Sequence, residues 1–161
     1  MDAASASRPD RVSPASRRAG RADLLRWGLA LVFAWSGGAK LSSLEVFQQS
    51  LGFWGFVPEA WLDPVSRIIP ATELLLAGWL ASGVARPAAL LLAAQLGALF
   101  ATLHAYLLAR GEVVPCACLL NNPLLTARPA THAGMLLLSL AVFAAAGAAL
   151  LLPVRSGSGR R

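Results

Sequence analysis

Long apolar stretches separated by short polar segments dominate this chain. Four such stretches lie at about residues 24–41, 68–84, 88–109 and 133–152. Each is close to the roughly 20 apolar residues that an α-helix needs to cross the hydrocarbon core of a bilayer. We therefore expect an all-α fold, an integral membrane four-helix bundle formed by residues 23–152. The link at 85–87 is so short that the second and third spans should be antiparallel neighbours.

The two ends of the chain have a different composition. Residues 1–22 are rich in Ala, Ser, Pro and Arg and have no apolar period, so we expect a disordered basic cytoplasmic tail. Residues 153–161 are expected to form a second, short basic cytoplasmic tail. The first apolar stretch follows positive charge, as a signal peptide does, but it is longer than the 7–15 residues of a signal core. We expect it to be retained as a span.

The basic residues predict the orientation of these spans. The cytoplasmic side of a membrane protein carries the excess of Lys and Arg near its spans. With four spans, Lys40, Arg67, Arg110 and Arg128 lie on one side, and the other Lys and Arg of the 14 lie with the two termini. Both termini are therefore expected in the cytoplasm of a bacterial cell, as in a multi-pass protein of the inner (plasma) membrane. The loop after the third span would face the oxidising exterior.

The first outer loop, between spans one and two, has a helical pattern. Ser42 and Glu45 have capping-box spacing, and Leu44, Phe47 and Leu51 share one helical face. A short interfacial helix is expected there. Aromatic residues follow, which suits rings at headgroup depth: Phe53, Trp54, Phe56 and Trp61.

Composition disfavours two broad classes of protein. Of the 161 residues, 57% are hydrophobic and 14% are charged, against about 45–50% and about 25% in soluble domains. These fractions disfavour a soluble globule. The formal net charge is +6, but no basic stripe is interleaved with aromatic residues, so we expect no nucleic-acid partner. The expected partner of the apolar surface is the lipid bilayer.

Three polar residues within the spans are candidates for chemistry, because polar groups at membrane depth are expensive. Lys40 ends the first span at the outer surface, and Glu73 lies roughly 10 Å below the outer start of the second span, at about 1.5 Å per residue. His104 lies about one and a half turns from the outer end of the third. These residues should converge on the outer third of the bundle.

The roles of these residues have more than one interpretation. Glu73 could move a proton as thiols or a quinone change redox state, or it could be a structural carboxylate held by Lys40 or by hydroxyls such as those of Ser36 and Thr72. His104 could be a hydrogen-bonded packing residue, or it could relay protons or contact a quinone. His132 is expected at the membrane interface. Three glycines are expected to permit close helix packing: Gly37, Gly38 and Gly78.

Cys116 and Cys118 are the main chemical feature of the sequence. Two cysteines are too few for a disulfide scaffold, but a bridge across one residue tends to be strained and easily exchanged. In the functional interpretation, the two cysteines form a reversible dithiol. In the structural interpretation, they are two unrelated buried thiols. Copper or mercury handling would need more soft ligands than His104 and His132 supply. We therefore expect no resident metal.

Several segments together resemble a known family. Ser36-Gly37-Gly38-Ala39-Lys40-Leu41 closes the first span, and the segment Pro70–Gly78 contains Glu73. With Pro58 after the aromatic loop, these segments resemble the DoxX-like superfamily of four-helix membrane proteins. The third span runs through Arg110-Gly111 into Val114-Pro115-Cys116-Ala117-Cys118. This is similar to the MauE branch, the methylamine utilisation membrane proteins, and the resemblance covers about residues 24–152.

The resemblance implies a function beyond what the residues alone indicate. MauE proteins are implicated in the maturation of methylamine dehydrogenase, whose small subunit carries many disulfides, beside a thioredoxin-like partner. Carried over, Cys116 and Cys118 match the family's dithiol, and Lys40 and Glu73 match its recurring polar positions. The chain departs from the family in reading Cys-Ala-Cys-Leu-Leu where Cys-Gly-Cys-Phe-Gly is frequent.

The leading hypothesis is a membrane thiol–disulfide oxidoreductase. Cys116 and Cys118 would exchange disulfides with a thioredoxin-like extracytoplasmic protein, and a membrane quinone is the candidate cofactor that would accept the electrons. Two alternatives stay open. One is a nonenzymatic assembly, transport or metal-handling protein, and the other is a DoxX-like subunit of a quinone-reducing complex.

Overall fold

The computed structural model describes residues 14–111 and 129–152, and within these ranges the chain is helical and forms no strand. The elements are α1 (Pro14–Ser42), α2 (Leu44–Trp54), the 3-10 helix η1 (Glu59–Trp61), α3 (Leu62–Ser82), α4 (Arg86–Ala109) and α6 (Pro129–Leu151). The four long helices contain the four expected apolar stretches to within two residues, so the all-α prediction is confirmed. Two of them, α4 and the part of α6 from His132 to Leu151, have the length and apolar composition of a membrane span.

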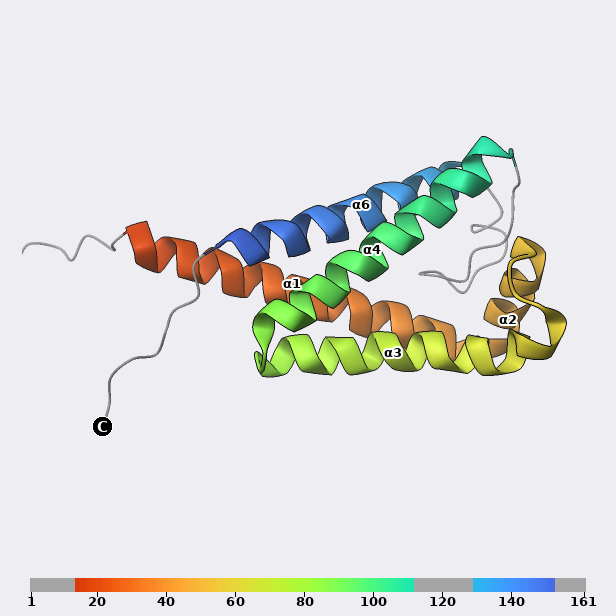
Figure 1. Cartoon of the computed structure of the whole chain (residues 1–161), viewed down its shortest axis with the longest axis horizontal. Helices are drawn as coiled ribbons and strands as arrows, with labels where there is room; N and C mark the ends of the chain where they lie inside the picture. The colour runs from red at the N-terminus through yellow and green to blue at the C-terminus, as the bar shows by residue number, and fades with distance from the viewer. Residues whose placement is uncertain (1–13, 112–128, 153–161) are drawn as a thin grey trace, which may run out of the picture.

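The long helices form two closely packed pairs (Figure 1). Helix α1 packs along α3, and α4 packs along α6, while contacts between the pairs are sparser. The pairs meet in one apolar cluster to which all four contribute buried side chains, among them Phe33, Leu80, Leu90 and Val142. This cluster holds the four helices together in the half of the bundle nearer the turn between α3 and α4.

Close approach within each pair depends on one glycine. A Cβ on Gly37 of α1 would lie 2.9 Å from the Pro70 carbonyl oxygen of α3, and a Cβ on Gly97 of α4 would lie 3.0 Å from the Phe143 nitrogen of α6. Both distances are to backbone, which cannot yield as a flexible side chain can. The prediction of close packing is therefore confirmed for Gly37. It is wrong for Gly38 and Gly78, because a Cβ there would meet nothing within 4 Å.

Helices α3 and α4 share a tight turn but diverge from it (Figure 1). Gly83 has φ 70° and Ala85 has φ 44°, so the chain reverses direction within a few residues. The expected antiparallel connection is present, but each of the two helices packs mainly against a different partner. The short link keeps α3 and α4 close together only at the turn. Along the rest of their length, side-chain packing decides which helix each one contacts.

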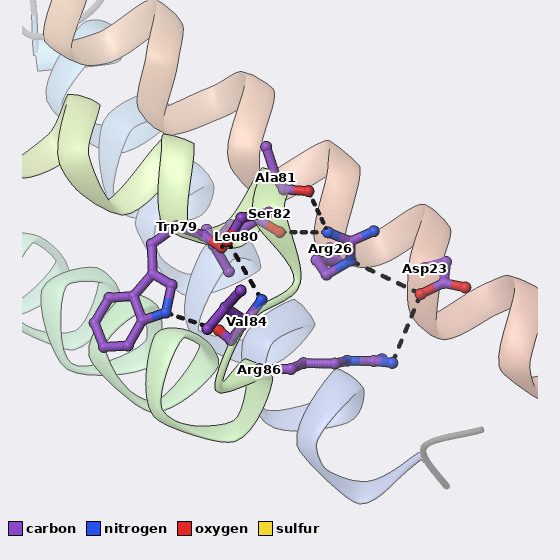
Figure 2. A network of polar contacts seen from close by, with 8 residues as sticks. All are labelled: Asp23, Arg26, Trp79, Leu80, Ala81, Ser82, Val84 and Arg86. Atoms are coloured by element: carbon purple, nitrogen blue, oxygen red, sulfur yellow. Dashed lines mark hydrogen bonds and ion pairs between the residues drawn. The ribbon is translucent and has the colours of Figure 1, made fainter. Parts of the chain in front are cut away.

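A polar network fixes the turn end of the bundle (Figure 2). Arg26 of α1 donates hydrogen bonds to the carbonyl oxygens of Leu80 and Ala81, the latter at 2.8 Å, at the C-terminal end of α3. Asp23 lies 3.7 Å from Arg26 and 3.6 Å from Arg86 of α4. A guanidinium satisfies carbonyls that the end of a helix leaves without partners and suits the negative end of its dipole.

The opposite end of the bundle is closed by α2. Phe47, Leu51 and Trp54 of α2 are buried against Leu107 of α4 and Met135 of α6. The predicted short helix is confirmed as an element, but its buried face covers the bundle. The helix ends at Gly55, whose φ of 70° suits a residue without a Cβ.

Two details of this loop differ from expectation. The N-cap of α2 is Ser43 and no side chain caps it, because the Ser42 hydroxyl donates to the carbonyl of Ala39 at 2.9 Å, within the preceding helix. The capping-box prediction is therefore wrong. Trp54 is buried, whereas the neighbouring aromatic rings are exposed, as rings at headgroup depth would be: Phe53, Phe56 and Trp61.

Part of the segment expected to be a disordered tail is helical. Helix α1 begins at Pro14, so residues 14–22 are helical. Proline is favoured in the first turn of a helix, and Ala22 is fully buried, so helical structure and packing extend beyond the apolar stretch. Residues 1–13 and 153–161, which complete the two predicted tails, lie outside the described residues, and the domain boundaries stay predictions.

Candidate functional site

A buried ion pair joins α1 to α3 near the end covered by α2. The Lys40 Nζ lies 2.8 Å from both carboxylate oxygens of Glu73, and it also donates to the Ser36 hydroxyl at 2.5 Å. Both charged side chains are only 1% exposed. Three acceptors match the three donors of an ammonium group, so the charge is fully satisfied although little water can reach it.

The ammonium group of Lys40 is enclosed by other helices. Aromatic rings from two other helices cover its ammonium group: Nζ lies 5.7 Å from the ring centre of Phe47 in α2 and 5.5 Å from that of Phe100 in α4. A cation over an aromatic face is stabilised by the ring's quadrupole. The charge therefore lies inside the bundle because α2 folds back over the end of α1.

The interpretation of Glu73 as a carboxylate held by Lys40 agrees with these contacts. Ser36 contributes through Lys40, whereas the Thr72 hydroxyl donates to the Ile68 carbonyl at 2.8 Å, within its own helix.

Two histidines meet beside this pair. His104 of α4 and His132 of α6 have ring centres 5.9 Å apart, and both are buried. The Nδ1 of His104 lies 2.7 Å from the Phe100 carbonyl oxygen. Because a carbonyl only accepts, Nδ1 must donate, which in the neutral ring leaves Nε2 as the acceptor nitrogen. The His132 side chain packs between helices, and its expected place at the membrane interface stays a prediction.

A small cavity connects these groups. Its volume is about 50 Å³, and its polar lining comes from all four long helices: Ser36 and Lys40, Glu73, His104, and Ser139. A buried water needs roughly 10–15 Å³ of such volume. By volume the cavity has room for a few waters beside the ion pair and His104, and the rest of its lining is apolar.

The expected convergence of polar residues is present for three of the candidates. Lys40, Glu73 and His104 line one cavity, although they come from three helices. Cys116 and Cys118 lie outside the described residues, so their place relative to this cavity stays a prediction. In the part of the chain that the structure describes, no three His, Cys, Asp or Glu residues are grouped as a metal site would need.

Phe100 and Ser139, which line the cavity, were not among the candidate residues, and the contact of His132 with His104 was not predicted. Helical spacing could have found them. Phe100 precedes His104 by one turn, and Ser139 follows His132 by two turns, so each pair shares a helix face. What the spacing could not give is which faces meet.

Comparison with known proteins identifies the family. No curated protein and no solved structure gives a significant match to the chain. Residues 19–154 match the family model described as methylamine utilisation protein MauE. The match includes every described helix from α2 to α6, most of α1, and the candidate site. The chain therefore belongs to the MauE family of methylamine utilisation proteins.

Proposed function

We propose that this chain is a four-span inner-membrane protein that relays disulfides during methylamine utilisation. Both termini lie in the cytoplasm, and Cys116 and Cys118 exchange disulfides with a thioredoxin-like extracytoplasmic protein. That partner delivers the disulfides to an enzyme of the methylamine dehydrogenase type. Membership of the MauE family supports the pathway, and the two points below support the topology and the chemistry.

The exposed surface supports four spans. Large apolar side chains point outward on α1 and α3 as well as on the two helices with the composition of spans. They include Leu24, Leu31, Trp35, Ile68, Leu75, Leu91, Leu99, Leu137, Leu140 and Phe143. A soluble monomer rarely exposes apolar surface on every side, whereas a bundle in lipid requires it.

The observation that carries the chemical proposal is the position of the buried polar site. Helix α4 ends at Ala109 and α6 begins at Pro129, so the segment with both cysteines leaves and rejoins the bundle at one end. His104 lies less than two turns before the C-terminal end of α4, and His132 lies in the first turn of α6. The dithiol segment is thus tethered at the end that holds the ion pair and the histidines.

The exchange itself is balanced without another reagent. The Cys116–Cys118 disulfide is reduced to a dithiol, while two thiols of the partner are oxidised to a disulfide, so two electrons and two protons pass to this chain. Attack in each direction requires a thiolate. The acceptor nitrogen of His104 and the carboxylate of Glu73, which share the small cavity, are the groups that we assign to proton transfer.

Thiol trapping in cells tests this proposal. Replacing Cys118 with Ser should leave a mixed disulfide between Cys116 and the partner, visible on a non-reducing gel and lost on reduction. The double Cys116→Ser/Cys118→Ser chain is the matched control and should trap nothing. If the wild-type cysteines are reduced in intact cells and neither single variant traps a protein or impairs partner oxidation, the relay is excluded.

The histidine pair favours metal handling as a second candidate function. Two imidazoles from facing helices lie 5.9 Å apart between ring centres, and imidazole with thiolate is a ligand set suited to copper. Purified protein that binds one equivalent of copper, and loses it when either cysteine or His132 is replaced, would support this alternative over the relay.

A further inference from the structure

A second, larger pocket lies between α2, α3 and α4. Its volume is about 360 Å³, within the roughly 300–1,000 Å³ of ordinary ligand pockets. Aliphatic and aromatic side chains form its walls, and the exceptions are the polar residues Thr72 and Glu73. The Thr72 hydroxyl is bonded to its own helix, and the Glu73 charge is balanced by Lys40. The pocket therefore suits an uncharged, apolar molecule.

The pocket opens through the side of the bundle. Ile68 of α3 and Leu99 of α4 line it and are 60% and 62% exposed. Figure 1 shows these two helices diverging from their shared turn, and α2 covers the wide end. In a membrane, an opening between two spans faces lipid tails, so the occupant of the pocket enters from the bilayer.

One hydrogen-bond donor in the wall indicates what the occupant carries. Trp54 lines the pocket and is only 8% exposed, and its Nε1 has no hydrogen-bond partner in the described ranges 14–111 and 129–152. A buried N–H without an acceptor is unfavourable, and native proteins rarely keep one. A ligand oxygen that only accepts, such as a ring carbonyl, would satisfy it.

The pocket also adjoins the polar site. Glu73 and Phe100 line both the 360 Å³ pocket and the small cavity of Lys40 and His104. A molecule in the pocket would thus lie beside the groups that we assign to proton transfer. A redox-active occupant needs this arrangement, because its reduction takes up protons as well as electrons.

We propose that this pocket binds a lipid-soluble quinone, with its ring near Trp54 and Glu73 and its chain passing out between Ile68 and Leu99. The redox role of the quinone rests on the proposed function. The reduced Cys116 and Cys118 thiols give two electrons and two protons to the quinone, which forms a disulfide and a quinol. Binding itself does not depend on the cysteines.

Quenching of tryptophan fluorescence tests the binding. Protein in nanodiscs is titrated with decylubiquinone, which should quench saturably. Trp54→Phe, which leaves the other four tryptophans, should remove the quenched component. Menadione, which keeps the ring carbonyls, should compete, and decylbenzene, which lacks them, should not. Quenching without saturation, or equal competition by decylbenzene, overturns the proposal, because the pocket would then hold any apolar chain.

Two variants locate the site independently of fluorescence. Val65→Phe narrows the pocket and should weaken crosslinking of a photoreactive azidoquinone at least tenfold, whereas Val84→Phe, at the exposed turn, should leave it unchanged. Trp54→Phe keeps an aromatic ring but loses the donor. It should weaken binding by about three- to tenfold, as expected for one neutral hydrogen bond. Undiminished crosslinking in both pocket variants would contradict the proposal.

Failure of this proposal is distinguishable from failure of the relay. If decylubiquinone does not bind saturably but Cys118→Ser still traps the partner, the relay stands and its electron acceptor lies elsewhere. If the quinone binds but no mixed disulfide forms, the pocket stands and the thiol chemistry is excluded.

Discussion

Replacing both members of the Lys40–Glu73 pair should be less damaging than replacing either one. Each side chain is 1% exposed, and Nζ lies 2.8 Å from both carboxylate oxygens. Lys40→Met leaves a buried carboxylate without its cation, and Glu73→Leu leaves a buried ammonium group without its anion. Removing one partner of a buried pair costs about 3–5 kcal/mol, whereas apolar replacement of both is often neutral or stabilising.

The expected values follow directly. Each single variant should lower the free energy of unfolding by about 3–5 kcal/mol, and the double variant should recover at least about 3 kcal/mol relative to the sum of the two. Unfolding is followed in mixed micelles by far-UV circular dichroism as the fraction of a denaturing detergent rises. The matched control is Arg67→Gln, which breaks an exposed pair with Asp63 at 2.9 Å and should leave the midpoint unchanged.

The additivity of the two substitutions decides the outcome. If the loss in the double variant equals the sum of the single losses, Lys40 and Glu73 do not interact in the folded protein. The same conclusion follows if either single variant is no less stable than Arg67→Gln. The site would then lack the ion pair from which the chemical proposal is built.

Three further predictions concern packing, the turn and topology. Gly37→Ala should destabilise the protein by about 1–3 kcal/mol, because its Cβ would meet backbone at 2.9 Å, while Gly38→Ala should be neutral or up to about 1 kcal/mol more stable; the opposite order contradicts the packing. Arg26→Gln should lower stability by about 1.5–3 kcal/mol in the same unfolding assay, because it leaves helix carbonyls without a donor; no change would show that the network of Figure 2 contributes nothing. In a chain without native cysteines, Glu59→Cys should react with a membrane-impermeant maleimide in intact spheroplasts and Val84→Cys only after permeabilisation; the reverse pattern would invert the proposed topology.

The positions of the helices could be predicted from the sequence because helix formation in this chain is local. The runs at 24–41 and 88–109 lie inside α1 and α4, and those at 68–84 and 133–152 end within two residues of α3 and α6, since apolar length and flanking polar residues are enough to specify a span. The predictions that depended on single polar residues were weaker. The capping box at Ser42 failed because that hydroxyl bonds backward into α1.

The composition of the site was only partly predictable. Lys40, Glu73 and His104 attracted attention because polar groups in apolar helices are expensive, and that reasoning holds for any fold. The burial of His132 was not predicted, because a position near the start of a span says nothing about which way the side chain faces. Its burial follows from the packing of α6 on α4, where the faces of two helices meet.

By itself, therefore, the sequence determined the helical class, the helix positions and the polar residues that must be accounted for. Tertiary structure alone decided that Lys40 turns inward under Phe47, that Glu73 lines both the small cavity and the larger apolar pocket, and that α3 and α4 diverge. The physical reason is the distance along the chain over which the interactions act. Helical hydrogen bonds join residues four apart, whereas these features arise from close packing between helices distant in the chain, which no local pattern encodes.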